Sequence, residues 1–357
     1  MATSAAPTSQ PGAVRDHGFH PLRIRRVVRE TAEAASFVLD VPAELRAAFG
    51  YEAGQFLTFR AHLRGEVHHR CYSMSSSPSV DDELQVTVKR VPGGLVSNWM
   101  IDSLGPGDVV EASVPAGVFL LAPGDGEIVA FSGGSGITPV FSLLKTALAT
   151  TSRRARLYYA NRDREAVIFG AELDALADRH PERFDVVHHL DVERGFVDAG
   201  ALDAFVQASS GAEFYVCGPT PFMDIVEGAL LAHGVDAHHI HIERFTPAAP
   251  AAEPEPPAAP DTGSTTTRIT VDLGGRTDTV DHRPGTTILQ TARQMGMAPP
   301  FSCESGTCAT CMAKLVEGSV KMHVNDVLTD DEVADGWVLT CQSVPTSTSV
   351  HVVYEGS

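Results

Sequence analysis

The chain has 357 residues, of which 43% are hydrophobic and 20% are charged, a composition typical of globular domains that bury cores. Its length predicts two or three domains, and its formal net charge of −18 disfavours nucleic acid and anionic membranes as partners, because both select basic surfaces. No apolar run approaches the roughly 18–20 residues that span a bilayer, and the first residues lack the apolar core of a signal peptide. We therefore expect a cytoplasmic protein without membrane insertion, whose acidic surface permits docking onto a basic protein partner.

Residues 20–120 contain short runs of alternating apolar and polar side chains that are separated by Gly and Pro. The alternation is clearest over 83–91, which predicts a half-buried strand with Thr87 on its polar face. Several such strands with turn signals between them predict an antiparallel barrel or sandwich.

From residue 127, predicted strands alternate with predicted helices. The first unit is a strand, a glycine loop and a helix, in which we expect Thr138 as the N-cap and Pro139 as the first helical residue. A further helix is expected over 164–180. This alternation predicts a parallel sheet covered by helices on both faces.

Residues 248–267 are rich in Pro, Ala and small polar residues, which predicts an extended, semi-rigid linker. The chain beyond the linker has the size of a small separate domain. Four of the six cysteines lie there, and such clustering in a long chain indicates metal binding rather than a disulfide framework.

Cys303, Cys308 and Cys311 have the spacing C-x4-C-x2-C, and Cys341 follows further along the chain. This is the spacing of plant-type ferredoxins that hold a [2Fe–2S] cluster. The residues between the cysteines are small, and Gly306 permits backbone angles that other residues avoid. A zinc site built from four cysteines remains the alternative, although such sites more often show two CxxC pairs. The segment 268–357 resembles a β-grasp ferredoxin domain.

Such a cluster carries one electron, whereas nicotinamide cofactors carry a hydride, and a flavin can join the two. Arg70, Tyr72 and Ser73 form an RxYS motif that resembles that of the ferredoxin–NADP reductase superfamily. The resemblance implies that the arginine pairs with a flavin phosphate, the tyrosine stacks on the ring system and the serine hydroxyl approaches N5. Taken alone, the motif is equally consistent with an ordinary half-buried strand, but segments 54–56 and 114–119 also match the superfamily.

Residues 88–100 are similar to the second phosphate-binding segment of the same superfamily, in a form that favours FAD over FMN. Backbone N–H groups and a hydroxyl at a helix start would hold the pyrophosphate. The expected FAD-binding residues of this segment are Lys89, Gly93, Gly94, Ser97 and Asn98.

Two glycine-containing loops, 132–140 and 217–223, are the expected nicotinamide site, since a helix start after a glycine loop accepts a diphosphate. A glycine loop alone is equally typical of a tight turn. The resemblance places Cys217 near the reacting carbon of the nicotinamide, and Glu243 and Phe245 near the flavin; for Phe245 a core position is the alternative. Ser73, Cys217 and Glu243 are the expected catalytic residues. The expected coenzyme-binding residues are Gly133, Gly134, Gly136, Thr138, Cys217, Gly218, Pro219 and Phe245.

Arg162 and Arg164 offer cations for the extra phosphate of NADPH, but Asp163 between them would repel it. We therefore favour NADH. The histidines of segments 188–189 and 238–241 have no accompanying carboxylate or cysteine pattern, so we expect surface or strand-edge positions rather than metal ligands.

The expected order is an FAD-binding barrel (18–122), an NAD(P)H-binding α/β domain (123–247), the linker and a [2Fe–2S] ferredoxin domain (268–357). This order resembles the reductase components of multicomponent oxygenases, above all the 3-ketosteroid 9α-hydroxylase reductases. The resemblance implies electron transfer from NAD(P)H through FAD and the cluster to a terminal Rieske-type oxygenase. An epoxidase of the phenylacetyl-CoA type or a membrane desaturase are alternative acceptors, and a zinc-binding adaptor on a degenerate reductase fold is the non-enzymatic alternative.

The acidic run Asp330, Asp331, Glu332 and Asp335 is either a docking face or a solvated surface.

Overall fold

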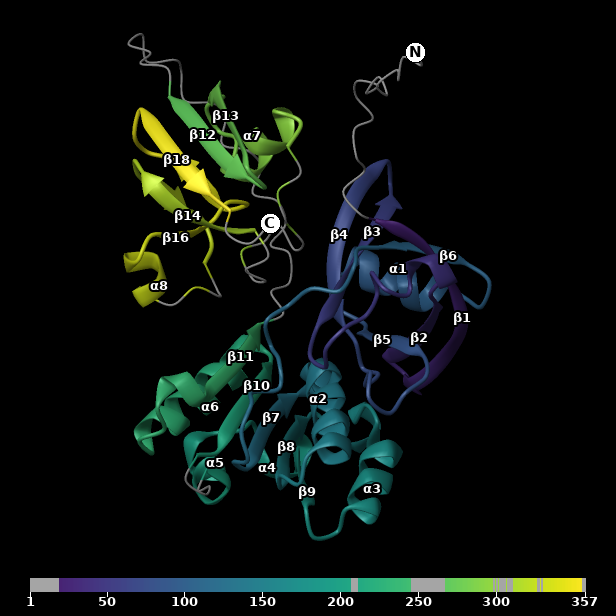
Figure 1. Cartoon of the computed structure of the whole chain (residues 1–357). Coiled ribbons are helices and arrows are strands. Elements are labelled where there is room, and N and C mark those ends of the chain that lie inside the picture. Colours follow the sequence, from purple (N-terminus) through teal and green to yellow (C-terminus); the bar gives the residue numbers. More distant parts are fainter. Residues whose placement is uncertain are drawn as a thin grey trace, which may run out of the picture.

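The computed structural model describes residues 19–206, 211–244, 267–297, 299, 301, 306, 311–325, 328 and 330–354. These residues form one six-stranded and two five-stranded sheets, together with a two-stranded ribbon. The three large sheets follow one another along the chain (Figure 1). Most of the predicted linker, with residues 245–266, lies outside the described residues.

The first sheet is an antiparallel barrel, as predicted. Its strand order is β4-β3-β6-β1-β2-β5, and a bridge between Met74 and Val86 joins the two ends. Apolar residues of alternate positions fill its interior, and α1 (Leu95–Ser103) packs against them. The strands are β1 (His20–Thr31), β2 (Ala34–Asp40), β3 (Phe56–Leu63), β4 (Glu66–Ser73), β5 (Leu84–Lys89) and β6 (Val109–Ala112).

We expected β5 to be half-buried, with Thr87 on its polar, exposed face. That expectation was wrong at Thr87, which is buried. Thr87 is only 3% exposed, and its hydroxyl lies 2.7 Å from those of both Ser36 and Ser75. A second layer of protein therefore covers this face, and the buried hydroxyls satisfy one another.

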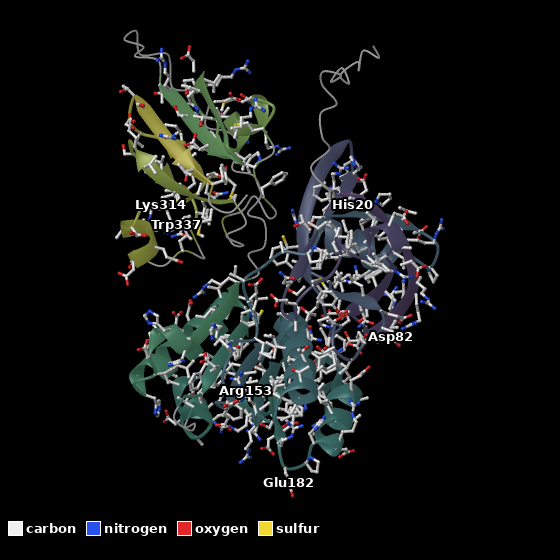
Figure 2. The ribbon with its side chains drawn as sticks, viewed as in Figure 1. His20, Asp82, Arg153, Glu182, Lys314 and Trp337 are labelled. Atoms are coloured by element: carbon white, nitrogen blue, oxygen red, sulfur yellow. The ribbon has the colours of Figure 1, made fainter. Side chains whose placement is uncertain are left out.

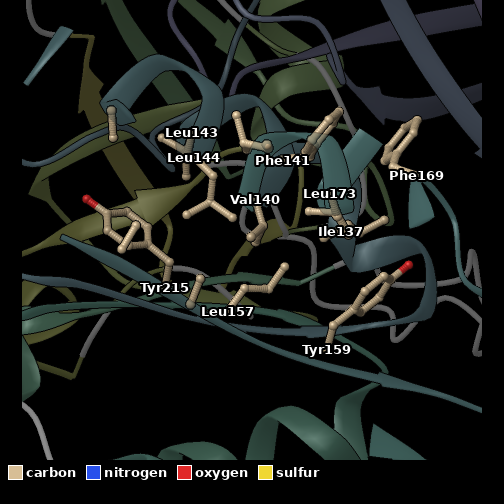
Figure 3. Packing of buried hydrophobic residues seen from close by; sticks show 14 of the residues in the cluster. Ile137, Val140, Phe141, Leu143, Leu144, Leu157, Tyr159, Phe169, Leu173 and Tyr215 are labelled. Atoms are coloured by element: carbon tan, nitrogen blue, oxygen red, sulfur yellow. The ribbon is translucent and has the colours of Figure 1, made fainter. Parts of the chain in front are cut away.

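The second sheet is entirely parallel, with the order β11-β10-β7-β8-β9. Helices α2 (Ile137–Thr150) and α3 (Gly170–Arg179) cover one face (Figure 3), and α5 (Ala199–Val206) and α6 (Thr220–Ala232) cover the other. This confirms the predicted α/β domain. Its strands are β7 (Ile128–Gly133), β8 (Ala155–Asn161), β9 (Phe184–Leu190), β10 (Glu213–Gly218) and β11 (Ile240–Arg244), with a short α4 (Asp191–Arg194) after β9.

Two predicted helix starts in this domain were wrong. Thr138 is not an N-cap, because a 3-10 turn, η2 (Gly134–Gly136), leads the chain into α2 earlier, and the Thr138 hydroxyl instead donates to the Ser135 carbonyl at 3.1 Å. The helix expected over 164–180 is divided into a 3-10 turn, η3 (Arg164–Ala166), and α3. Phe169 separates them in a left-handed conformation with φ of 60°, which its burial in the core stabilises.

The third sheet, with the order β13-β12-β18-β14-β16, packs on α7 (Ile288–Gln294) and confirms the predicted β-grasp domain. Thr287 and Gln290 form a capping box at the start of α7. The strands are β12 (Arg268–Leu273), β13 (Arg276–Asp281), β14 (Met312–Glu317), β16 (Trp337–Leu339) and β18 (Ser349–Val353), beside the ribbon of β15 (Val320–Met322) and β17 (Ser343–Pro345) and the short α8 (Asp330–Ala334). None of the described helices is both long and apolar enough to cross a membrane.

Candidate functional site

The RxYS residues lie at the end of β4, beside β3. The Ser73 side chain is 1% exposed, and its hydroxyl has no hydrogen-bond partner in the described part of the protein. The Tyr72 ring contacts the Phe59 ring edge-on at 5.7 Å, and burial raises the pKa of its phenol, which keeps it neutral. Since a buried polar group without a partner costs free energy, the Ser73 hydroxyl indicates that another group binds beside it.

The segments 54–56 and 114–119, which match the superfamily in sequence, pair with each other in space. The Phe56 N–H donates to the Ala116 carbonyl at 2.8 Å, and the Ala116 N–H donates back at 3.0 Å. Gly54 has a φ of 95°, and a Cβ atom there would lie 1.8 Å from the Phe119 carbonyl oxygen. Only glycine fits this close approach.

The turn before α1 has the form of an anion site. Gly93 has a φ of 71°, and a Cβ on Gly94, the N-cap of α1, would lie 2.6 Å from the Ser97 hydroxyl. The Ser97 hydroxyl accepts a hydrogen bond from the Val91 N–H at 3.2 Å, so it supports the turn from beneath. Asn98 Oδ1 is buried without a partner among the described residues. The turn therefore offers N–H groups at a helix start together with an unsatisfied amide.

Lys89 connects the barrel to the parallel sheet. It ends β5, and its ammonium would lie 3.1 Å from a Cβ built on Gly134 in the glycine loop. Burial lowers the pKa of Lys89, and the nearby carboxylates of Glu33 and Asp163 oppose that shift. A partly desolvated cation thus lies between the two expected nucleotide sites.

The two glycine-containing loops pack against each other at the carboxyl ends of β7 and β10. A Cβ on Gly136 would lie 2.1 Å from the Cys217 carbonyl oxygen, and one on Gly133 would lie 2.8 Å from the Pro219 ring. A Cβ on Gly218 would come within 2.9 Å of the Gly133 nitrogen. Close backbone approach, rather than a tight turn alone, requires these glycines.

Three neighbouring strands place Ser132, Cys217 and Glu243 in one row. Cys217 pairs with Ser132 on β7 and with Glu243 on β11. Ser132 is fully buried, and its hydroxyl has no partner in the described part of the chain. Burial, together with the Glu243 carboxylate, raises the pKa of the Cys217 thiol well above its ordinary value. This row lies where open α/β sheets bind ligands, at the carboxyl ends of the strands.

Asp163 already has partners within its own loop. Its carboxylate accepts hydrogen bonds from the Ala166 N–H at 2.9 Å and from Arg162 Nε at 2.7 Å. It therefore caps η3 and neutralises Arg162, which we considered a cation for the NADPH phosphate.

Of the expected cluster ligands, Cys311 and Cys341 are described, and both are buried. Cys303, Cys308 and Phe245 lie outside the described residues. Thr340 links the two described cysteines: it precedes Cys341, and its N–H and hydroxyl donate to the Cys311 carbonyl at 3.2 and 2.8 Å. The Tyr354 hydroxyl donates to the Thr340 hydroxyl at 2.8 Å. Gly306 has a φ of 84°, and a Cβ there would lie 2.7 Å from the Val324 carbonyl oxygen.

The acidic run lies on α8 and the turn after it. Asp335 pairs with Lys314 at 2.6 Å, and the Lys314 ammonium also lies 5.0 Å from the centre of the Trp337 ring (Figure 2). The first turn of α8 contains Asp330, Asp331 and Glu332. Their negative charges are stabilised by the positive end of the helix dipole.

The histidines lie at the edges of the parallel sheet, as predicted, with His188 and His189 on β9 and His241 on β11. His189 is nevertheless buried, and its ring bonds the Tyr158 hydroxyl and the Gly195 carbonyl, both at 2.8 Å. Within the described residues, no group of three or more histidine, cysteine or acidic side chains could hold a metal ion.

Sequence reasoning missed Ser132 and Thr340. Ser132 is the first residue of the loop 132–140 and Thr340 directly precedes Cys341, so a place in or beside a motif was their only signal. Their roles depend on burial and on contacts between distant segments, which the sequence does not display.

Three family models match the chain in the order of the three sheets. An oxidoreductase FAD-binding domain matches residues 21–120, and an oxidoreductase NAD-binding domain matches 131–228. A 2Fe-2S iron-sulfur cluster binding domain matches 271–346.

Proteins of similar length share this organisation. The ferredoxin reductase component of 3-ketosteroid-9-alpha-monooxygenase from Mycolicibacterium smegmatis is 40% identical over 344 residues, which cover 94% of this chain and 96% of that protein. A component of 1,2-phenylacetyl-CoA epoxidase from Escherichia coli is 33% identical over 354 residues, covering 94% and 98%. The solved structure of phthalate dioxygenase reductase is 27% identical, has a TM-score of 0.61, and covers 96% of this chain and 100% of that one.

Proposed function

This chain belongs to the family of oxygenase reductase components with FAD-binding, NAD-binding and [2Fe–2S] domains, and from that premise we propose that its electron acceptor is a terminal Rieske-type oxygenase. It is an NAD(P)H-dependent flavin and iron–sulfur oxidoreductase. Bound FAD would supply the link between the two carriers, because a flavin can take up a hydride and release its electrons one at a time to a [2Fe–2S] cluster. The protein positions the cofactors and tunes their surroundings.

On the flavin side, the unsatisfied Ser73 hydroxyl and the turn at Gly93 and Gly94 fit a bound flavin nucleotide. We assign Arg70 to the phosphate, Tyr72 to the ring system and Ser73 to the ring nitrogen that receives the hydride. Lys89, Ser97 and Asn98 complete this set. Ser97 acts by holding the turn, because its hydroxyl already accepts from Val91.

On the nicotinamide side, the glycines 133, 134, 136 and 218 let the coenzyme approach the backbone, and Pro219 and Thr138 fix the two loops around them. We assign Cys217 a catalytic position as a neutral thiol, with Glu243 beside it. Phe245 keeps its assignment near the flavin. Asp163, which neutralises Arg162, supports NADH as the coenzyme.

The cluster ligands are assigned to Cys303, Cys308, Cys311 and Cys341. The buried Cys311 and Cys341, held together through Thr340, fit a compact inorganic cluster. The zinc-binding adaptor is not supported, since the matching family model is that of a [2Fe–2S] domain.

One observation carries the assignment of the two nucleotide sites: β5 of the barrel contacts the glycine turn of the parallel sheet through Lys89 and Gly134. The expected flavin and nicotinamide sites therefore open toward each other. A reductase that transfers a hydride between two bound nucleotides requires such an arrangement.

The relatives support the choice of acceptor. The 3-ketosteroid-9-alpha-monooxygenase reductase favours a steroid-hydroxylating oxygenase, whereas the epoxidase component keeps the epoxidase alternative open, and a membrane desaturase is a third choice. We place the reductase in the cytoplasm. We keep 18–122 as the FAD-binding domain, 123–247 as the NAD(P)H-binding domain, 248–267 as the linker and 268–357 as the ferredoxin domain.

The test is anaerobic reduction of purified acceptors by NADH and catalytic amounts of this protein. A Rieske oxygenase that hydroxylates steroids should be reduced within the time of turnover, as its visible spectrum reports, and product should form when oxygen is admitted. Reduction of an epoxidase or a desaturase but of no Rieske oxygenase would replace the proposal with the corresponding alternative.

A further inference from the structure

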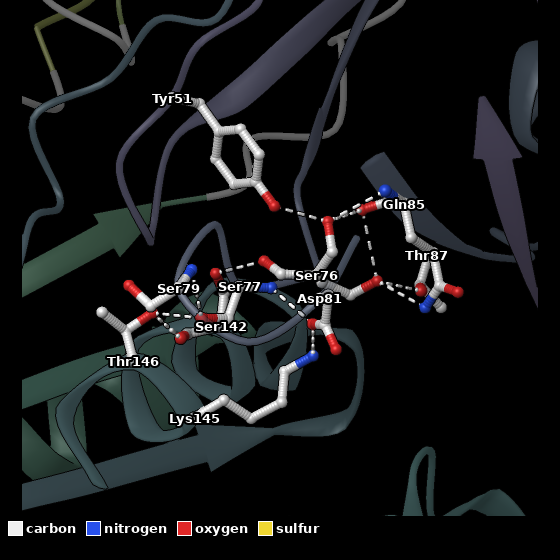
Figure 4. Close-up of polar contacts among 11 residues, drawn as sticks. Tyr51, Ser76, Ser77, Ser79, Asp81, Gln85, Thr87, Ser142, Lys145 and Thr146 are labelled. Carbon is white, nitrogen blue, oxygen red and sulfur yellow. Dashed lines mark hydrogen bonds and ion pairs between the residues drawn. The ribbon is translucent and has the colours of Figure 1, made fainter. Parts of the chain in front are cut away.

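Three polar contacts join the chain after β4 to the middle turns of α2, and we call them the interdomain latch (Figure 4). They lie between the barrel and the parallel-sheet domain, in a layer of buried hydroxyls. The contacts are Ser77 with Thr146 (2.7 Å between hydroxyls), the Ser142 hydroxyl with the Ser76 carbonyl (2.5 Å), and the ion pair of Lys145 with Asp81.

The ion pair is held in place on both sides. The Asp81 carboxylate also accepts from the Ser77 N–H at 2.6 Å, which fixes its orientation. The Lys145 ammonium lies 4.6 Å from the centre of the Phe141 ring, and its side chain is only 12% exposed. The Asp81 side chain is 35% exposed, so the ion pair is shielded from solvent mainly on the lysine side.

Both latched segments lead directly to the expected cofactor sites. Segment 76–81 follows Ser73 at the end of β4, and α2 begins at Ile137, immediately after the glycine turn of η2. The latch residues of α2 lie five to nine positions beyond Ile137, which is roughly 8–14 Å along the helix axis. A rotation of α2 would therefore displace the glycine turn relative to β4.

An apolar contact holds α2 at the same turns, on another face of the helix. Ala34, Ala53 and Phe119 of the barrel share a buried cluster with Leu143 and Leu144 of α2. One contact alone would leave the helix free to rotate about it, whereas two contacts fix its angle. The latch is the second contact.

Apolar packing does not fill the region beside the latch. A cavity of about 720 Å³ opens there between the barrel and helices α2 and α3, and its lining includes Ser76, Asp81, Phe141, Lys145 and Phe169. Since side chains do not close this gap, the polar contacts of the latch determine the separation of the two domains on this side.

We propose that Asp81 and Lys145 are positioning residues that set the angle of α2, and through it the distance between the nicotinamide loop and the flavin strand. The inference rests on the proposed function, because it assigns these residues to the hydride-transfer geometry. Neither residue touches substrate or cofactor. Their effect is transmitted by α2 and by the chain that joins Ser73 to Asp81.

The test compares Lys145→Met with Lys145→Arg in the full chain loaded with FAD and cluster. Stopped-flow reduction of the flavin at saturating NADH should slow about tenfold in Lys145→Met, since small misplacements of reacting groups have large kinetic effects. The NADH concentration for half-maximal rate and the FAD content should stay close to those of the wild type. Lys145→Arg should recover most of the rate. Arg154→Met, which breaks an exposed ion pair with Asp185 within one domain, is the matched control.

A second readout does not depend on activity. Thermal unfolding of the FAD-free protein should show that the effects of Asp81→Asn and Lys145→Met on stability are not additive. The double variant should be no less stable than either single variant. A wild-type rate in Lys145→Met, or equal slowing by Lys145→Arg without coupling, would overturn the inference. Neither measurement involves an oxygenase, so a wrong acceptor leaves the result intact. Failure of NADH to reduce the wild-type flavin would instead reject the proposed function.

Discussion

Cys217 on β10 lies directly opposite Glu243 on β11 in the parallel register of the two strands. The cysteine is completely buried, and burial followed by the nearby carboxylate raises the pKa of its thiol well above the ordinary value. An acid with a raised pKa stays protonated at neutral pH. The residue therefore serves as a neutral, polarisable side chain rather than as a thiolate nucleophile.

Cys217 should accordingly resist alkylation. At about pH 8, iodoacetamide should modify it at least about tenfold more slowly in the native protein than in the unfolded chain, because only the thiolate reacts. Peptide mass spectrometry measures both rates, with the partly exposed Cys71 as internal reference. Equal rates in the two states would show that the thiol is neither buried nor neutral.

Ser73→Ala should separate stability from catalysis. Removing a buried hydroxyl that has no partner among the described residues should leave the FAD-free protein as stable or slightly more stable. Reduction of bound flavin by NADH should slow by about 10²–10³-fold, the usual cost of losing a donor to developing charge.

Ser75→Ala is the matched control for this change. The Ser75 hydroxyl is bonded to Thr87 at 2.7 Å, so its loss should destabilise the protein by about 1 kcal/mol and affect flavin reduction much less. Unfolding curves and stopped-flow traces of both variants check the contrast. Identical behaviour of the two alanine variants would contradict the assignment of Ser73.

Gly136→Ala should damage the nicotinamide site. The added methyl group would lie 2.1 Å from the Cys217 carbonyl oxygen, so the two loops must separate. We expect a loss of roughly 1–3 kcal/mol in unfolding free energy, as in other overpacked sites, together with weaker NADH binding. Gly228 of α6 has no atom within 4 Å of its Cβ position, so Gly228→Ala should instead stabilise the protein by about 0.5–1 kcal/mol. Calorimetry and coenzyme titration would decide, and unchanged NADH affinity in Gly136→Ala would be the contrary result.

Thr340→Val should weaken the cluster. The change removes the hydrogen bond that the Thr340 hydroxyl donates to the Cys311 carbonyl and the one that it accepts from the Tyr354 hydroxyl, at a cost of about 1–3 kcal/mol. The visible absorbance of the cluster should therefore decay faster in the presence of an iron chelator. Thr340→Ser keeps the hydroxyl and should behave like the wild type; equal decay in both variants would remove Thr340 from cluster retention.

The acidic first turn of α8 should steer the acceptor. The residues to neutralise are Asp330, Asp331 and Glu332 of that turn, whereas Asp335, which pairs with Lys314, is kept. Their amide triple variant should reduce the oxygenase more slowly at low salt and with a flatter salt dependence. The Debye length falls from ~10 Å at 0.1 M to ~3 Å at 1 M, so steering is lost at high salt in any case.

The control for steering carries the same charge change on another domain, at the exposed Asp174, Asp178 and Glu182. Flavin reduction by NADH should be unaffected in either variant, since it occurs within the reductase. A salt slope equal to that of the wild type in the α8 variant would show that this turn is a solvated surface.

The parts of the molecule that the sequence predicted are those whose signals are local. The C-x4-C-x2-C spacing and the glycine loops each lie within a few residues, and so does the alternation that identified β5. The parts that it did not predict are contacts between distant segments. Asp81 and Lys145 are 64 positions apart, and Thr87 is buried only because Ser36 and Ser75 meet it from two other segments.

The wrong helix starts have the same origin. Thr138 followed by Pro139 has the composition of a helix start, but contacts of η2 with β10 bring the chain into the helix two residues earlier. Phe169 takes a left-handed conformation that its burial against Phe141 compensates, at a ring separation of 4.7 Å. Tertiary packing outweighs local propensity at both positions.

The double engagement of Asp163 bears on attempts to redesign coenzyme preference. The obvious exchange for accepting NADPH would replace this acid and release Arg162, yet the same carboxylate caps the 3-10 turn that leads to α3. Asp163→Ser keeps a side-chain oxygen for the cap while it frees the arginine, whereas Asp163→Ala removes both functions. Because one carboxyl group both pairs with Arg162 and caps the turn, a library that varies position 163 without retaining a capping side chain would weaken the turn before α3 whenever it frees the arginine.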